Sequence, residues 1–133
     1  MGDLDGLAIR YASASPEQEK LLAETKLILE SGRKAAKTGD AETWNRCSDE
    51  FHLVFYRYCG NSRLTESAER LRSGISIFSN QYSKETVIQT QIDNEHQAIF
   101  DAYQNGEIEK VVQMMKSHLD DSLKYALSFL PEN

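Results

Sequence analysis

Three histidines, His52, His96 and His118, are the residues of this sequence whose type and spacing best suit chemistry. Each lies in a separate stretch of helical periodicity, on or beside its apolar stripe. His96 takes the place of the hydrophobic residue expected between Ile92 and Ile99. An imidazole buried without a hydrogen-bond partner would destabilise the fold by roughly a few kcal/mol. The three positions therefore indicate either hydrogen-bonded core histidines or one ion that all three bind.

The other two histidines follow the same pattern. His118 stands between Met115 and Ser122, and His52 lies about 100° around its helix from Phe51, at the edge of the stripe. A lone histidine on an apolar face is more often a hydrogen-bonded core residue. Three of them on three helices strengthen the case for a shared metal, and both interpretations stay open at this point.

A site made of three imidazoles would suit a divalent metal such as zinc or nickel, because these ions accept neutral nitrogen ligands. Three protein nitrogens leave at least one coordination position open. Such a position binds water or a ligand oxygen, unlike a closed structural site. A small organic acid could therefore dock through its carboxylate.

The elements that must position these histidines are all predicted to be helices. The two prolines, Pro16 and Pro131, fall where a helix begins or has ended, and Ser15 with Gln18 has the form of a capping box. The predicted helices run over about Asp3–Ala12, from Ser15 to Lys37, from a cap at Asp40 to Gly60, from a cap at Asn61 through Phe78, through Ile88–Tyr103 to a stop at Asn105 and Gly106, and from Ile108 to a point before Pro131.

The apolar stripes of the first and fourth helices predict which of their residues face the core. The stripe of the first helix contains Leu4, Leu7, Ala8 and Tyr11. That of the fourth helix contains Leu64, Ala68, Leu71, Ile75 and Phe78. The polar segment Asn80–Glu85, between the fourth and fifth helices, is predicted to be a loop.

Six helices with short connections predict an all-α fold, an antiparallel bundle in which one helix could be split to give seven. We expect the third, fifth and sixth helices to surround a central cavity for a metal and a ligand. The 133 residues suit one domain, residues 1–133.

The overall charge argues against a free-standing nucleic-acid binder. The chain has 15 Lys and Arg against 21 Asp and Glu, a formal net charge of −6. It has no apolar run of about 18 residues and no signal-peptide core, so we expect a cytoplasmic protein without a membrane partner. Cys47 and Cys59 are predicted to lie on one helix, roughly 18 Å apart, and therefore to stay reduced.

The sequence resembles a known family at its most distinctive residues. The first motif is Asp49-Glu50-Phe51-His52 followed by Gly60-Asn61, and the second is Glu95-His96-Gln97-Ala98-Ile99, then Ala102, Gly106-Glu107, Met115 and His118-Leu119. Leu7-Ala8 and Ser15-Pro16-Glu17 resemble the family's opening helix and the turn after it. Together they resemble the FCD domain, the C-terminal, effector-binding half of the FadR-like branch of GntR transcription regulators.

This resemblance implies a ligand-sensing domain and not an enzyme. Members carry an N-terminal winged helix-turn-helix that binds operator DNA as a dimer, and that half is missing from this chain. Their helical bundle holds a divalent metal through an Asp and three His, and a small organic acid binds there. By this resemblance His52, His96 and His118 are the metal ligands, and a homodimer is expected.

The fourth ligand departs from the family pattern. The family's Asp stands four residues before the first histidine, where this sequence has Ser48. Asp49 comes one residue later, about 100° around the helix from Ser48. We expect Ser48 to reach the metal through a water, with Asp49 as the alternative ligand; a pocket without metal also occurs in the family.

Two arginines are candidates for binding the effector's carboxylate. Arg72 matches a position in the fourth helix where the family often has a basic residue, and Arg10 on the first helix is a second candidate. The competing interpretation of Arg72 is an exposed side chain that lies over the bundle.

Two other functions remain as alternatives. Asp49-x-x-His52 and Asp93-x-x-His96 are similar to the carboxylate-x-x-His pairs of di-metal bundles, but Met115 stands where His118 would need a carboxylate. A mononuclear hydrolase would need a general base, for which Glu95 and Asp49 are the candidates. A metal-free helical oligomerisation module is the third possibility.

Overall fold

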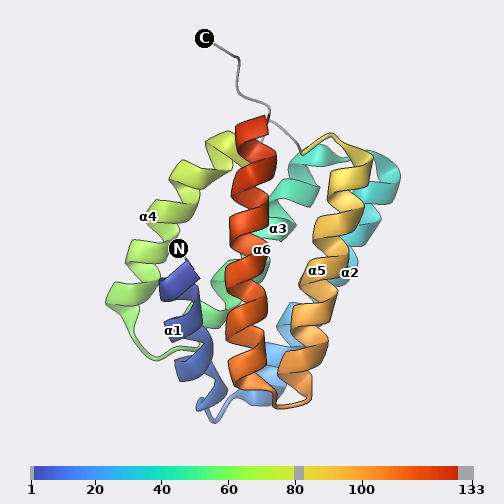
Figure 1. Cartoon of the computed structure of the whole chain (residues 1–133). Helices are drawn as coiled ribbons and strands as arrows, with labels where there is room; N and C mark the ends of the chain where they lie inside the picture. Colours follow the sequence, from blue (N-terminus) through green and yellow to red (C-terminus); the bar gives the residue numbers. More distant parts are fainter. Residues whose placement is uncertain (1, 80–82, 129–133) are drawn as a thin grey trace.

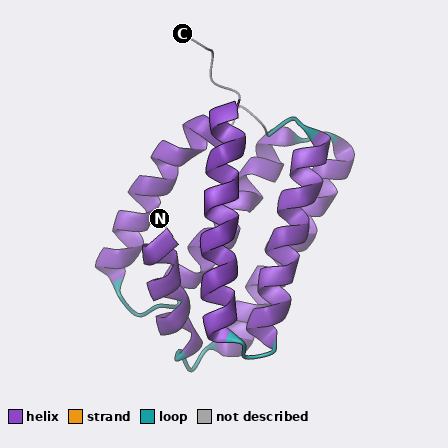
Figure 2. Cartoon of the chain, in the orientation of Figure 1, coloured by secondary structure: helices purple, strands orange, loops and turns teal. Residues whose placement is uncertain are grey.

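The computed structural model describes residues 2–79 and 83–128 of the chain, with the backbone only for residues 75–79. This part contains six helices and no strand, which confirms the predicted all-α class (Figure 2). The helices are α1 (Gly2–Ser13), α2 (Gln18–Thr38), α3 (Ala41–Arg57), α4 (Ser62–Ser79), α5 (Thr86–Gln104) and α6 (Ile108–Ser128).

Successive helices run in opposite directions, so the bundle is antiparallel (Figure 1). In this view α6 lies in front, between α1 and α5, with α3 behind it. α2 packs against α3 and α5, whereas α1 packs against α6 and α3. α4 packs mainly on α3 and touches α1 and α6 less. The three helices that carry histidines, α3, α5 and α6, therefore meet at the centre of the bundle.

Side chains from all six helices contribute to a buried core. Phe51 and Phe55 of α3 are its largest members, and Phe51 stacks on the ring of His96 with centroids 4.2 Å apart. A smaller cluster lies beside it: Ala35, Trp44, Ile92 and Ala126. The histidine layer thus borders aromatic and aliphatic side chains.

Two predicted stripes are wrong in part, because each helix turns a charged residue inward. Ala8 and Ala68 are buried as predicted, whereas the side chains of Ile75 and Phe78 lie outside the described residues. On α1, Leu7 and Tyr11 are 39% and 51% exposed, while Asp5 is 2% exposed. On α4, Leu71 is 45% exposed and Arg72 is 6% exposed. Both buried charges have charged or polar partners near the histidines, which offsets the free-energy cost of burying them.

Two of the three predicted N-caps are confirmed. Asp40 Oδ1 accepts a hydrogen bond from the backbone N–H of Thr43 at 3.1 Å. Asn61 Oδ1 accepts from the N–H groups of Arg63 and Leu64 at 3.1 and 3.2 Å. These side chains satisfy amide groups that a helix start leaves without partners, and so they fix where α3 and α4 begin.

The capping box predicted for the second helix is wrong. α2 begins at Gln18, and Ser15 lies in the turn before it. The Gln18 side chain donates to the carbonyl oxygens of Ala12 and Ser15 at 2.6 and 2.9 Å, and it accepts from the Tyr103 hydroxyl at 2.7 Å. It joins the end of α1 to α5 and is not available to cap its own helix.

The remaining boundaries agree with the expected ones where they can be compared. Residues 83–85 of the predicted loop are not helical, whereas residues 80–82 and the predicted end of the last helix near Pro131 lie outside the described residues. Cys59 lies just past the end of α3 instead of on it, because α3 ends at Arg57. Cys47 and Cys59 are both free.

Candidate metal centre

The structure brings the three histidines together at the centre of the bundle. His96 Nε2 lies 2.9 Å from His118 Nε2, which in turn lies 3.3 Å from His52 Nε2. All three residues are buried, and each offers one nitrogen within 4.8 Å of the other two. Positions 52, 96 and 118 come from three different helices, so only the folded bundle makes this arrangement.

The separations between these nitrogens fit a single bound ion. Two nitrogens bound to one zinc ion at about 2.0–2.1 Å lie roughly 2.9 Å apart at a right angle and roughly 3.4 Å apart at the tetrahedral angle. Two of the three nitrogen–nitrogen distances of the centre fall in this range, and the third is no longer than 4.8 Å. The donor set, three neutral imidazoles, also suits a divalent metal of the zinc or nickel kind.

Two carboxylates fix which nitrogen of the His52 and His118 rings faces the centre. Asp5 Oδ2 lies 3.2 Å from His52 Nδ1, and Glu95 Oε1 lies 2.9 Å from His118 Nδ1. A carboxylate accepts a hydrogen bond from Nδ1–H, which leaves the lone pair of Nε2 directed to the centre. Lone pairs at this spacing repel one another unless a cation lies between them.

The surroundings also oppose protonation of two of the rings. Burial lowers the pKa of His52 and of His96 well below the ordinary 6.5. The positive charge of Arg72 lowers both further. A metal ion, which needs neutral imidazoles, therefore fits this site better than protons do.

Asp5 is the functional residue that the sequence analysis missed. It is 2% exposed, and the Tyr56 hydroxyl donates to its Oδ1. Burial raises its pKa from 3.8 to about 6, against the opposing effect of the Tyr56 hydrogen bond. The sequence spacing could have indicated that Asp5 is buried. Asp5 lies four and seven positions before Ile9 and Ala12, and therefore on the same face of the helix.

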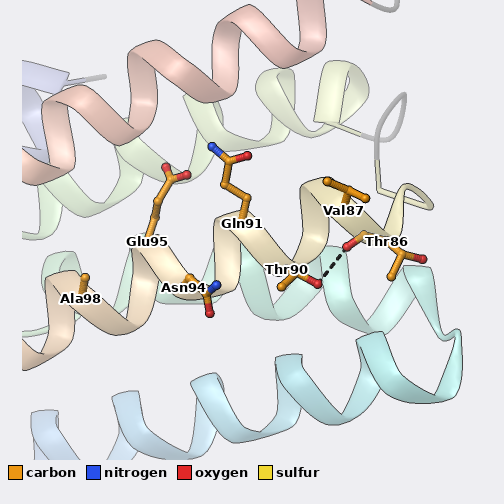
Figure 3. A pocket seen from close by; sticks show the side chains of 7 residues that line it. All are labelled: Thr86, Val87, Thr90, Gln91, Asn94, Glu95 and Ala98. Atoms are coloured by element: carbon orange, nitrogen blue, oxygen red, sulfur yellow. Dashed lines mark hydrogen bonds between the residues drawn. The ribbon is translucent and has the colours of Figure 1, made fainter.

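Glu95 connects the centre to the surface of α5. Its side chain is 24% exposed and borders an open groove of about 610 Å³ on the outer face of this helix. Figure 3 shows Glu95 and Gln91 on the side of α5 that faces α6. The groove is lined by Thr86, Val87, Thr90, Gln91, Asn94, Glu95 and Ala98.

Ser48, the predicted fourth position, lies near one of the three rings. Ser48, Asp93 and His96 line a small cavity of about 10 Å³, with Cys47, Gly32 and two aliphatic side chains of α2. This volume is about that of one water probe. A water could therefore join the Ser48 hydroxyl to polar groups around His96.

Neither carboxylate of the two Asp-x-x-His pairs is among the atoms that converge on the centre. Asp49 Oδ1 accepts from Arg72 Nη2 at 2.7 Å, on the side of α4. Asp93 Oδ1 accepts from the indole N–H of Trp44 at 3.0 Å. The group of converging ligand atoms found among the described residues consists of the three histidines alone, which removes the support for the di-metal alternative.

Arg72 is buried beside the centre, so the prediction of an exposed side chain over the bundle is wrong. Its Nη2 donates to Asp49, whereas its Nε has no hydrogen-bond partner among the described residues. Its charge lowers the pKa values of Asp5, His52 and His96. The guanidinium is thus a buried cation whose Nε–H has no partner among the described residues.

Arg10, the other effector candidate, lies away from the histidines. Its Nε and Nη2 both donate to the carboxylate of Glu109 at 3.0 Å, and both side chains are largely exposed. The structure therefore does not place Arg10 with the other candidate residues. The reason is the register of α1, which directs Asp5 inward and position 10 toward solvent.

Comparison with known protein families supports the resemblance to the FCD domain. The model of this domain matches residues 2–121, nearly the whole chain. Comparison with curated proteins and with solved structures returns no match. None of the described helices combines the length and the apolar character that a bilayer-spanning segment requires.

Proposed function

The chain belongs to the FCD domain family, and from this premise we propose that it senses a small organic acid for a GntR-type transcription regulator. FCD domains are regulatory, effector-binding domains and not enzymes. The observation that supports the finer proposal is the convergence of three buried imidazole nitrogens. In this proposal His52, His96 and His118 bind one divalent metal, zinc or nickel or a similar ion.

The charge of such a centre is suited to an anion. A divalent ion on three neutral imidazoles keeps its positive charge, and when bound it offers a Lewis-acid position to a carboxylate oxygen. Asp49, which could have neutralised it, is bound to Arg72 instead. The missing fourth protein ligand at Ser48 leaves a place that a water or the effector's carboxylate can take.

Arg72 is the second group proposed to hold the effector. It is 6% exposed with its Nε unpartnered among the described residues, and a carboxylate is the usual partner of such a donor. Arg72 also lines a groove of about 310 Å³ between α3 and α4, which offers a route from the surface to this side chain. The groove is lined by Arg46, Asp49, Glu50, Leu53, Arg57, Glu69, Arg72 and Ser73.

The signal is proposed to pass to a separate N-terminal DNA-binding domain. An effector can shift the domain between two conformations only if it binds them with different affinities. With 15 Lys and Arg against 21 Asp and Glu, this chain alone is not expected to hold DNA. A homodimer would match the two-fold symmetry of operator sites.

The geometry supports binding more than hydrolysis. A metal-assisted hydrolase would need a general base free to take a proton from water. Glu95 is bonded to His118 and Asp49 to Arg72, so both candidate bases already have partners. No residue is therefore proposed as catalytic.

Metal content tests the proposal directly. Protein purified without chelator and without a polyhistidine tag should contain about one metal ion per chain. His96→Ala and His118→Ala should remove it, because two imidazoles bind such an ion much more weakly than three. Asn94→Ala, an exposed change on the same face of the bundle as the α5 groove, should keep it.

Binding of the effector is tested on protein that contains the metal. Titration calorimetry with acetate, lactate and citrate should give binding that disappears after chelation of the metal. Two metal ions per chain would favour the di-metal enzyme, and none would favour the oligomerisation module. Binding of these acids with full affinity to the His96→Ala protein would contradict the role proposed for the metal.

A further inference from the structure

α1 supplies none of the three imidazoles, yet it places one carboxylate among them. Asp5 bridges two side chains of α3: Oδ2 lies 3.2 Å from His52 Nδ1, and Oδ1 accepts the Tyr56 hydroxyl. His52 and Tyr56 are four residues, or one helical turn, apart. A single side chain of α1 is therefore bound at two points of the helix that carries a metal ligand.

We propose that Asp5 is a positioning residue that couples metal binding at the histidines to the docking of α1. The inference rests on the metal site of the proposed function. When Nε2 of His52 binds a cation, electron density leaves the ring and its Nδ1–H becomes a stronger donor. The bond to Asp5 then strengthens, and by thermodynamic linkage docked α1 tightens metal binding to the same extent.

The other contacts of α1 make its docking sensitive to Asp5. Ile9 and Ala12 are buried, but the ion pair of Arg10 with Glu109 is largely exposed, and such pairs stabilise little. A carboxylate as buried as that of Asp5 would oppose docking unless its hydrogen bonds are made. A change in the strength of those hydrogen bonds therefore changes how stably the whole of α1 docks on the bundle.

The hydrogen bond of Glu95 to His118 does not couple a further helix to the metal site. It joins α5 to α6 through His118, and both of these helices already carry a metal ligand. Among the hydrogen bonds of the described residues, only that of Asp5 joins a helix without an imidazole to one of the three rings. Among the described helices, α1 is thus the one whose position reports whether the centre is occupied.

Zinc affinity, measured by competition with a chromophoric chelator, is the first test. Asp5→Asn, which keeps the shape but removes the charge, and Asp5→Ala should bind zinc roughly 10- to 100-fold more weakly. Asp3→Asn is the matched control, since it removes a fully exposed carboxylate from the same helix. It should stay within about twofold of the unchanged protein.

Hydrogen exchange with zinc or with chelator separates coupling from a merely structural role. Zinc should slow exchange of the α1 amides in the unchanged chain, and in Asp5→Asn it should protect α3, α5 and α6 but not α1. The unchanged chain suffices for this test even if a variant fails to fold. If zinc protects the ligand-bearing helices of the unchanged chain without α1, or if Asp5→Asn binds zinc normally, the coupling is refuted and the metal site stands. If the unchanged chain binds no zinc, both fail.

Discussion

Burial shifts the pKa values of His52 and His96 in the opposite direction to the pKa of Asp5, although all three residues lie in one buried centre. Burial lowers the pKa of each histidine well below 6.5, whereas it raises the pKa of Asp5 from 3.8 to about 6. Between the native and the unfolded pKa values, the unfolded histidines bind protons that the native histidines do not. For Asp5 the reverse holds, because the native carboxylate binds a proton that the unfolded one does not. The two effects act in different ranges of pH.

The stability of the metal-free protein should fall as the pH is lowered. Below about 6.5 the unfolded chain gains up to two protons at His52 and His96 that the native state lacks, each worth about 1.4 kcal/mol per pH unit. Below about 6, protonation of native Asp5 offsets one of them until about 3.8. Urea unfolding in chelator, from pH 8 to pH 5, should show a loss of stability that begins near pH 6.5 and reaches about 1.4 kcal/mol per pH unit, the equivalent of one proton, between pH 6 and pH 5.

The same titration has an internal control. In Asp5→Asn the offset below pH 6 should disappear, so that the loss steepens toward two protons, or about 2.8 kcal/mol, per pH unit. A free energy of unfolding that stays constant or rises on acidification would contradict the neutral state of the two histidines.

Sequence reasoning found the three histidines and Arg72 but not Asp5. Histidines on apolar stripes can be recognised in the sequence, because each is a polar residue that interrupts a hydrophobic repeat. Asp5 stands 47 positions before His52 and beside a stronger-looking stripe that contains Leu7 and Tyr11. Only the rotation of α1 about its axis, which depends on tertiary contacts, decides which of these faces turns inward.

At the scale of elements, α4 is the helix with the least support from its neighbours. Gly74 lies within it, exposed, and a Cβ placed there would meet no atom within 4 Å. A glycine inside a helix destabilises it by roughly 0.5–1 kcal/mol relative to alanine, because the unfolded chain has more freedom to lose.

Gly74→Ala should therefore raise the free energy of unfolding by roughly 0.5–1 kcal/mol, measured by urea unfolding. Gly39→Ala is the matched contrast, since that position is equally open but has a φ of 75°. There alanine should lower stability by roughly 1 kcal/mol, because its Cβ is strained in the left-handed region. Equal effects of the two substitutions would contradict the helix end placed at Gly39.

Helix positions were largely predictable, because local chemistry sets them. Asp40 and Asn61 cap where their residue types indicate, and the glycines at 39, 60 and 106 all have positive φ. The error at Gln18 has a non-local cause, since this side chain bonds to the end of α1 and to Tyr103. Contacts of that range are not encoded in the spacing of neighbouring residues.

At the scale of the whole molecule, the histidine centre ties together segments that are far apart in the chain. Its three rings come from α3, α5 and α6, and Asp5 adds α1. Arg72 of α4 acts on the rings through its positive charge, which lowers the pKa values of His52 and His96. Among the described residues, neither α2 nor α4 makes a hydrogen bond to one of the rings. Metal binding at the centre should consequently stabilise the whole fold and not one helix alone.

Zinc at about 100 times its dissociation constant should stabilise the folded state by about 2.7 kcal/mol, which for a domain of this size raises Tm by roughly 10 °C. Differential scanning calorimetry with zinc and with chelator measures the shift. His96→Ala should melt at one temperature under both conditions. A chelator-insensitive Tm in the unchanged protein would show that the ion does not bind the native state.

Trp44 is the sole tryptophan of the chain. It is 1% exposed, and its indole donates to Asp93, which lines the same small cavity as His96. Indole emission depends on the polarity and hydrogen bonding around the ring, and here no second indole contributes. The intrinsic fluorescence of the chain therefore comes from one point beside the histidines, so that ions and acids entering the centre can be followed optically without any attached dye.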